Sequence, residues 1–202
     1  MNFKSLAFCF FAVLFVFGLS ACSGPQVTRL DPSEEVDFSG NWNDTDSRQV
    51  SSEMIMDSLS RPWVDEYIRK HNKKPRVIVG AVINKTDEHI TTETFVKDLE
   101  MALTNSGKVV MVASSAQRGE IRAERDDQAV NARADTAKAH GREMGADFMV
   151  KGQLNTIPDK KKGAELKYYQ VELEMINIET NEKVWIGQKQ IKKVVARKKY
   201  KV

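Results

Sequence analysis

Apolar residues recur at helical spacing in two stretches of the chain. Val50, Met54, Ile55 and Leu59 are three or four positions apart, which places them on one face of a helix. Polar residues 41–47 come directly before this stripe, and their side chains can accept hydrogen bonds from the free N–H groups of a helix start. A second stripe consists of Phe95, Leu99, Ala102 and Leu103. The helix that carries it is expected to be capped by Thr91 or Thr92 and to end at residues 105–107.

Three further helices are predicted from weaker patterns. Ser60 is expected to cap a short helix with Pro62 in its first turn. Proline is tolerated there because the N–H that it lacks would have no hydrogen-bond partner within the helix. The expected buried side of this helix consists of Trp63, Tyr67 and Ile68.

Ser114 or Ser115 should open a highly charged helical region, and the sequence predicts another helix over residues 136–144. Ile121 and Val130 are the few apolar anchors of the charged region. Because so little of it can be buried, we expect it to be exposed to solvent.

The remaining segments are typical of strands. Residues 76–84 form a nearly continuous apolar run, which predicts a strand covered on both faces, and residues 109–112 and 147–155 follow as strands. A polar loop is expected over 158–163. Residues 166–178 alternate between apolar and polar, and a turn at 179–182 leads into a last strand over 183–195. The fold class predicted is α/β, a single small domain with a mixed, partly antiparallel sheet and flanking helices.

The first 40 residues have a different composition. Lys4, an apolar run over 6–19 and the small residues before Cys22 are typical of a secretory signal peptide, predicted here as residues 1–21. Leu19-Ser20-Ala21-Cys22 resembles the lipobox of bacterial lipoproteins, which implies lipidation of Cys22. Because Ser23 and not Asp follows, the resemblance implies the outer membrane, with the chain facing the periplasm. An ordinary secreted protein is the alternative.

Residues 22–40 are rich in Gly, Pro and acids and show no periodicity, so they are interpreted as a flexible tether ahead of a globular domain over 41–202. About 20 extended residues reach about 65–70 Å. The chain has two cysteines, Cys9 and Cys22. The first lies in the predicted signal peptide and the second is expected to be lipidated, which leaves no thiol for catalysis or metal binding.

No pattern for catalysis, a metal or a cofactor is found. The glycine and serine motifs of phosphate-binding loops, dinucleotide sites and hydrolases are absent. The histidines lack metal-ligand spacing, and no paired acids lie where a dry pocket is expected. A net charge of +3 and a predicted exported location argue against nucleic acid, although basic groups at 160–162 and 192–201 suit anionic head groups or cell wall.

Several longer motifs resemble one family, the LpoB-type outer-membrane lipoproteins that activate penicillin-binding proteins. They lie at residues 77–86, 92–95, 102–108, 145–148 and 179–187. The resemblance implies a domain related to the N-terminal domain of TolB. It also implies a non-enzymatic role, in which the protein docks on a class A penicillin-binding protein and stimulates peptidoglycan synthesis close to the wall.

Two other functions remain open at this stage. One is a subunit of an envelope assembly or secretion complex resembling CsgG-like lipoproteins, and the other is an enzyme acting on the wall. If the chain is an activator, its docking surface is expected to be polar with few anchors. The candidate partner-binding residues are Arg118, Arg122 and Arg125 in the charged helical region, and His89 in a turn.

Overall fold

The structure is a computed structural model, and it describes residues 27–31, 34–161 and 164–196. The chain divides into two compact units, residues 1–34 and 35–202. The second unit contains every described helix and strand. In chain order these are α2 Asp44–Ser60, α3 Trp63–His71, β1 Arg76–Lys85, α4 Thr92–Asn105, β2 Val110–Met111, α5 Ser115–Asn131, β3 Phe148–Lys161, β4 Ala164–Asn177 and β5 Lys183–Ala196.

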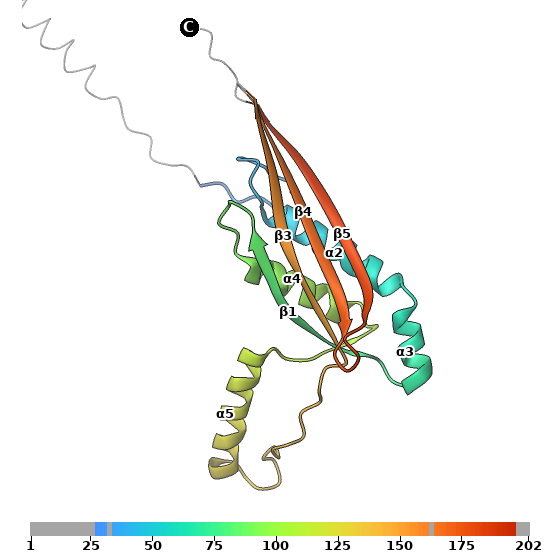
Figure 1. The fold of residues 1–202 in the computed structure, drawn as a ribbon. Helices are drawn as coiled ribbons and strands as arrows, with labels where there is room; N and C mark the ends of the chain where they lie inside the picture. The colour runs from blue at the N-terminus through green and yellow to red at the C-terminus, as the bar shows by residue number, and fades with distance from the viewer. Residues whose placement is uncertain (1–26, 32–33, 162–163, 197–202) are drawn as a thin grey trace, which may run out of the picture. The chain divides into compact units, whose positions relative to one another are not determined.

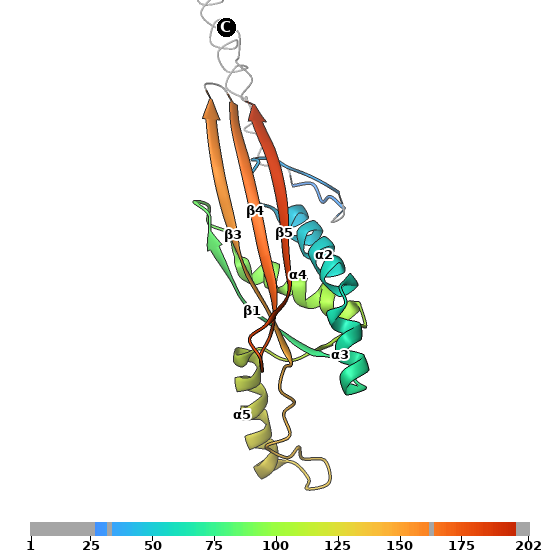
Figure 2. The ribbon, with the colours of Figure 1, turned by 45° about the vertical axis from the view of Figure 1, so that its right-hand side comes forward.

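The strands form one five-stranded sheet in the order β2-β1-β3-β4-β5 (Figure 1). β1 runs parallel to both β2 and β3, whereas β3, β4 and β5 are antiparallel neighbours. α2 and α4 pack on each other and on the sheet, and Figure 2 shows them on the same side of it. The predicted fold class, a small α/β domain with a mixed sheet and flanking helices, is confirmed.

The core lies between the two helices and the face of the sheet that they cover, called the inner face here. Both predicted helical stripes are buried there, apart from Ala102, which is partly buried. Asn43 caps α2, because its side chain accepts a hydrogen bond from the Asp46 N–H while Asp46 accepts one from Asn43. β4 adds its alternate residues to the core, as its pattern predicts: Tyr169, Val171, Leu173 and Met175.

The prediction that β1 is covered on both faces is wrong. Val77, Val79 and Val82 are buried, but Ile83 is 51% exposed on the opposite, outer face. A shift in register between Val79 and Val82 explains the continuous apolar run, because the irregularity turns both of these valines inward.

Five smaller predictions are also wrong. Ser60 ends α2, with its hydroxyl donating to the Asp57 carbonyl, and α3 begins behind Pro62. Residues 136–144 are not a helix. The predicted loop at 158–163 belongs to β3 as far as Lys161, and its last two residues lie outside the described part. Ile121 and Val130 are exposed and do not anchor α5, and Ile68 is exposed at the edge of α3.

Candidate partner-binding surfaces

α5 and the segment that follows it form an arm, residues 115–146, at the end of the sheet where β1 and β3 begin. Ser114 caps α5 in a reciprocal pair of hydrogen bonds with Gln117. No residue of α5 is buried. The sequence predicts this exposure correctly, because the helix carries too few apolar residues to pack against a core.

The part of the arm after α5, residues 132–146, is called the returning segment here. An ion cluster holds it against α5. Arg122 donates two hydrogen bonds to Glu143, at 2.9 and 2.8 Å, and Arg125 donates a third at 2.6 Å. Hydrogen bonds from Arg122 and Arg125 lower the pKa of Glu143 to about 2, and Glu143 raises the pKa of Arg122. The carboxylate is therefore ionised at neutral pH. We call these three residues the Glu143 cluster.

A cleft opens where the returning segment meets the outer face of the sheet. Arg118 and Glu143 contribute its charged groups, and Arg118 also donates to the Ala113 carbonyl at 2.7 Å. The remaining lining is mainly apolar and includes Ile78, Met144, Met149 and Ile178. Polar groups over a partly exposed apolar floor can bind a protein surface with few anchors.

The structure does not bring the four predicted partner-binding residues together. Arg118, Arg122 and Arg125 lie on the arm, beside the start of β1. His89 is exposed in the turn that follows the end of β1, at the other end of that strand. Glu143, which organises two of the arginines, was missed because it is 18 and 21 residues away in sequence.

Residues 37–43 form a strap that crosses the inner side of β4 and β5. Lys193 contacts Asp37 and Asp46 at 2.8 and 2.6 Å. Burial by itself lowers the pKa of Lys193, but its hydrogen bonds to these two carboxylates outweigh burial and the net shift is upward. The hydrogen bond from Lys193 lowers the pKa of Asp37. Gly40 is buried with φ +71°, a conformation that favours glycine, and its Cα faces Val195. The end of the predicted tether is thus held on the sheet.

A second polar cluster lies beneath the strap. Glu88 accepts hydrogen bonds from Tyr169 at 2.6 Å, Lys167 at 2.7 Å and the Trp42 N–H at 3.2 Å. Burial by itself raises the pKa of Glu88, but these donors outweigh it and the net shift is downward. Burial and the neighbouring Glu88 carboxylate raise the pKa of Tyr169. The tyrosine therefore stays a neutral donor to a charged carboxylate.

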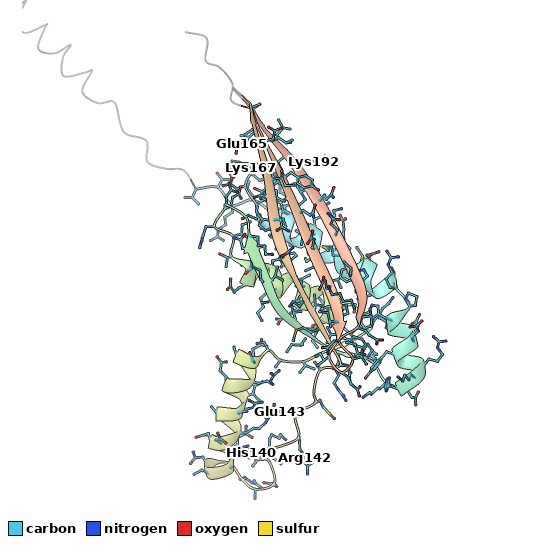
Figure 3. The ribbon with its side chains drawn as sticks, viewed as in Figure 1. His140, Arg142, Glu143, Glu165, Lys167 and Lys192 are labelled. Atoms are coloured by element: carbon cyan, nitrogen blue, oxygen red, sulfur yellow. The ribbon has the colours of Figure 1, made fainter. Side chains whose placement is uncertain are left out.

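The strap and the arm lie at opposite ends of the sheet. The register pairs Lys161 with Ala164 and Ala164 with Ala196 at the strap end, and Phe148 with Asn177 at the arm end. The 14 residues of β3 span roughly 45 Å between these ends. Figure 3 shows the same separation, with Lys167 and Lys192 near one end of the sheet and Glu143 near the other.

Cys22 lies outside the described residues. Within the described ranges, no group of three or more acidic, histidine or cysteine side chains could hold a metal ion. No helix in these ranges is both long and apolar enough to cross a membrane.

A model of the family described as peptidoglycan-synthase activator LpoB matches residues 46–191, most of the chain. The chain belongs to the LpoB family. The resemblance predicted from the sequence motifs is confirmed, and the family is regulatory by its description. A search of curated proteins finds no match.

Solved structures of LpoB and of another lipoprotein are also similar to the chain. The LpoB C-terminal domain from Salmonella enterica is 16% identical, with 64% of this chain and 93% of that one covered at a TM-score of 0.37. The NMR structure of Escherichia coli LpoB is 16% identical, with 89% and 85% covered at a TM-score of 0.38. Lipoprotein GNA1162 from Neisseria meningitidis is 8% identical, with 62% and 88% covered at 0.38. The family assignment depends on the family model and not on these scores.

Proposed function

We propose that this protein is a lipid-anchored outer-membrane activator that binds a class A penicillin-binding protein and thereby stimulates peptidoglycan synthesis. The observation that carries the proposal is the family match, which spans residues 46–191 and so includes most of α2, all of α3, α4 and α5, and nearly all of the sheet. The lipobox-like sequence that ends at Cys22 supports the anchor.

The α5 arm is the proposed docking surface for the synthase. It combines exposed charge on α5 with the partly apolar cleft beside Glu143. It also lies at the end of the sheet opposite the strap, by which the N-terminal segment enters the domain. A tether that enters at one end leaves the other end free to meet a partner across the periplasm.

The charged groups of the arm suit recognition of a partner protein better than acid–base catalysis. The Glu143 cluster pairs one carboxylate with two arginines, and Glu143, with its pKa near 2, is ionised at neutral pH. Such a group positions side chains and recognises charge, and it is a poor general acid or base. The proposed role of the arm is therefore to select and orient a partner.

The first test measures glycan polymerisation. The mature chain with Cys22→Ser is mixed with each class A penicillin-binding protein of the organism, and consumption of a fluorescent lipid-linked precursor is followed with time. We expect direct binding and faster polymerisation with one synthase, and no consumption by the chain alone. If no synthase binds and no rate changes, the proposal is wrong, and the size of membrane-extracted complexes then tests the assembly-subunit alternative.

The second test inverts the Glu143 cluster without removing its ion pairs. Arg122→Glu and Arg125→Glu are combined with Glu143→Arg, so that opposite charges still face each other but the sign presented to a partner is reversed. We expect at least a tenfold loss of synthase affinity. Lys97→Glu on α4, whose lysine pairs with Glu100, lowers the net charge by the same amount and should leave affinity unchanged.

The outcome of the second test also locates the interface. If the inverted cluster binds normally, the arm is not the docking surface, and His89→Glu then tests the opposite end of β1. The anchor is tested separately by mass spectrometry of the membrane-extracted protein, which should show diacylglycerol on Cys22. After a high-salt wash, which removes weakly bound protein, Cys22→Ser should be found in the soluble periplasmic fraction.

A further inference from the structure

A small apolar patch stands on the outer face of the sheet at the strap end. Ile157 lies opposite Tyr168, and Leu166 lies opposite Val194, in two neighbouring rows of the antiparallel strands. Ile157 is 62% and Val194 is 71% exposed, while Leu166 and Tyr168 are half-buried. We call these four residues, together with Lys192, the tip patch.

The patch differs from the middle of the same face. There the rows consist of glutamine, asparagine and glutamate, and Glu172 accepts hydrogen bonds from Gln153 at 2.7 Å and from Gln170. Such a ladder is satisfied in water and needs no cover. The tip patch has no comparable polar ladder, although Tyr168 donates to Gln170 at 3.0 Å on the side facing the middle of the sheet.

A positive charge lies within the patch. The Lys192 ammonium lies 5.5 Å from the centre of the Tyr168 ring, and Lys160 and Lys161 occupy the last two positions of β3. In the sequence, the six residues after Ala196 include four cations, Arg197, Lys198, Lys199 and Lys201. Two acids are close in the register: Asp159 lies opposite Leu166, and Glu165 precedes Leu166 in β4.

The N-terminal segment reaches the domain at this same end. Tyr169 donates to the Gly40 carbonyl at 3.3 Å and Lys193 binds Asp37, so the strap crosses the inner face of the same strands that carry the tip patch on their outer face. The 15 residues from Cys22 to Asp37 extend at most about 50 Å. A lipid on Cys22 would thus keep the strap end within that distance of a membrane surface.

We propose that the tip patch is a contact site for an anionic phospholipid surface. An aromatic and aliphatic cluster beside lysines is the combination that suits a membrane interface, where rings and aliphatic groups enter the head-group region and lysines bind anionic lipids. Each lysine near such a surface contributes about 1 kcal/mol. A second copy of the chain fits less well, because pairing two tip patches would bring their lysines together.

This contact goes beyond the proposed function, because it needs neither the synthase nor the acyl anchor. With both contacts in place, the membrane holds the strap end and the arm points away from it. The lipid surface would then orient the domain as well as retain it.

The test is flotation of the mature chain with Cys22→Ser on vesicles. Vesicles of phosphatidylethanolamine with phosphatidylglycerol are compared with vesicles of phosphatidylcholine alone, at low and high salt. We expect binding to the anionic vesicles that weakens with salt. Ile157→Glu with Val194→Glu should reduce the bound fraction at least tenfold, and Lys192→Glu should reduce it severalfold.

A matched pair of variants controls for charge. Ile83 and Ile186 lie on the same outer face, away from the tip patch, and are 51% and 63% exposed. Ile83→Glu with Ile186→Glu therefore adds the same charge at similarly exposed sites and should leave vesicle binding unchanged. Lys151→Glu is the corresponding control for Lys192→Glu. The thermal unfolding midpoint of every variant is measured to verify folding.

Three results would overturn the proposal. The first is no binding of the unaltered chain to anionic vesicles. The second is an equal loss of binding in the tip variants and their controls, which would indicate attraction by overall charge. The third is a concentration-dependent dimer, or binding to purified peptidoglycan, that the tip variants abolish while vesicle binding persists. Activation of a synthase is scored separately, so either proposal can fail alone.

Discussion

The helix-covered core and the α5 arm are held by different forces. In the core, residues such as Phe95, Leu99 and Leu173 are completely or almost completely buried between helices and sheet. On α5 nothing is buried, and the ion pairs of the Glu143 cluster link the helix to the returning segment. Burying one large apolar side chain stabilises a fold by about 1.5–3 kcal/mol, whereas an exposed ion pair contributes about 0–1 kcal/mol.

The strap region lies between these extremes. Its interactions are polar, as in the arm, but Glu88 and Lys167 keep only 17% and 15% of their side-chain surface exposed. Polar groups at this depth must be paired, because removing one partner leaves the other without water. The comparison indicates that stability is concentrated in the core and strap, which leaves the sequence of the arm free to be shaped by recognition.

The largest expected effect comes from the core. Leu99 is fully buried on α4, and Leu99→Ala removes its contacts and leaves a cavity, so the free energy of unfolding should fall by about 2–5 kcal/mol. Ile121→Ala on α5 is the matched change in the arm and should cost less than about 0.5 kcal/mol. Urea unfolding followed by tryptophan fluorescence measures both. Similar losses in the two variants would contradict the division into core and arm.

A smaller loss is expected in the strap region. Tyr169→Phe removes the hydroxyl that donates to Glu88 and to the Gly40 carbonyl, and should cost about 1–2 kcal/mol. Amide hydrogen exchange should also become faster in residues 37–43. Tyr168→Phe, on the outer face of the same strand, is the control and should change neither quantity appreciably.

The same cluster predicts the response to acid. Because the folded pKa of Glu88 lies below its ordinary value of 4.5, the ionised carboxylate stabilises the fold above that pH. This contribution is lost as the pH falls below 4.5 and through the folded pKa. Tyr169→Phe removes one of the hydrogen bonds that lower the pKa of Glu88. The stability of this variant should therefore fall less steeply over that pH range than the stability of the unaltered chain.

The sequence is most informative where the signal is local. The stripes of α2 and α4 and the alternation of β4 are periodic within a single element, and the structure buries the residues that they select, Ala102 only partly. By contrast, Glu88 and Lys167 are 79 residues apart and Glu143 is separated from its arginines by a turn-rich segment. No spacing rule links such residues, because the fold brings them together.

Two errors in the predicted elements have identifiable causes. Pro158 and the charged residues after it suggested a loop, but β1 ends its pairing at Asn155, and beyond that point β3 is an edge strand. An edge tolerates proline because one side of the strand needs no hydrogen bond from it. In residues 136–144, Gly141 adopts φ +70° and interrupts a segment whose composition favours a helix.

The smallest effect on stability is expected at Glu143, and it separates local order from global stability. Glu143→Gln keeps the shape of the side chain but removes the charge that pairs with Arg122 and Arg125. The urea midpoint should not move, because the residue contributes nothing to the core. Amide exchange in residues 132–146 should nevertheless become faster, and high salt should produce part of the same change in the unaltered chain. Since the pKa of Glu143 is lowered to about 2, acid should loosen this segment only as the pH falls towards that value. A shifted urea midpoint would show that the arm supports the core, and the contrast between the two regions would then be wrong.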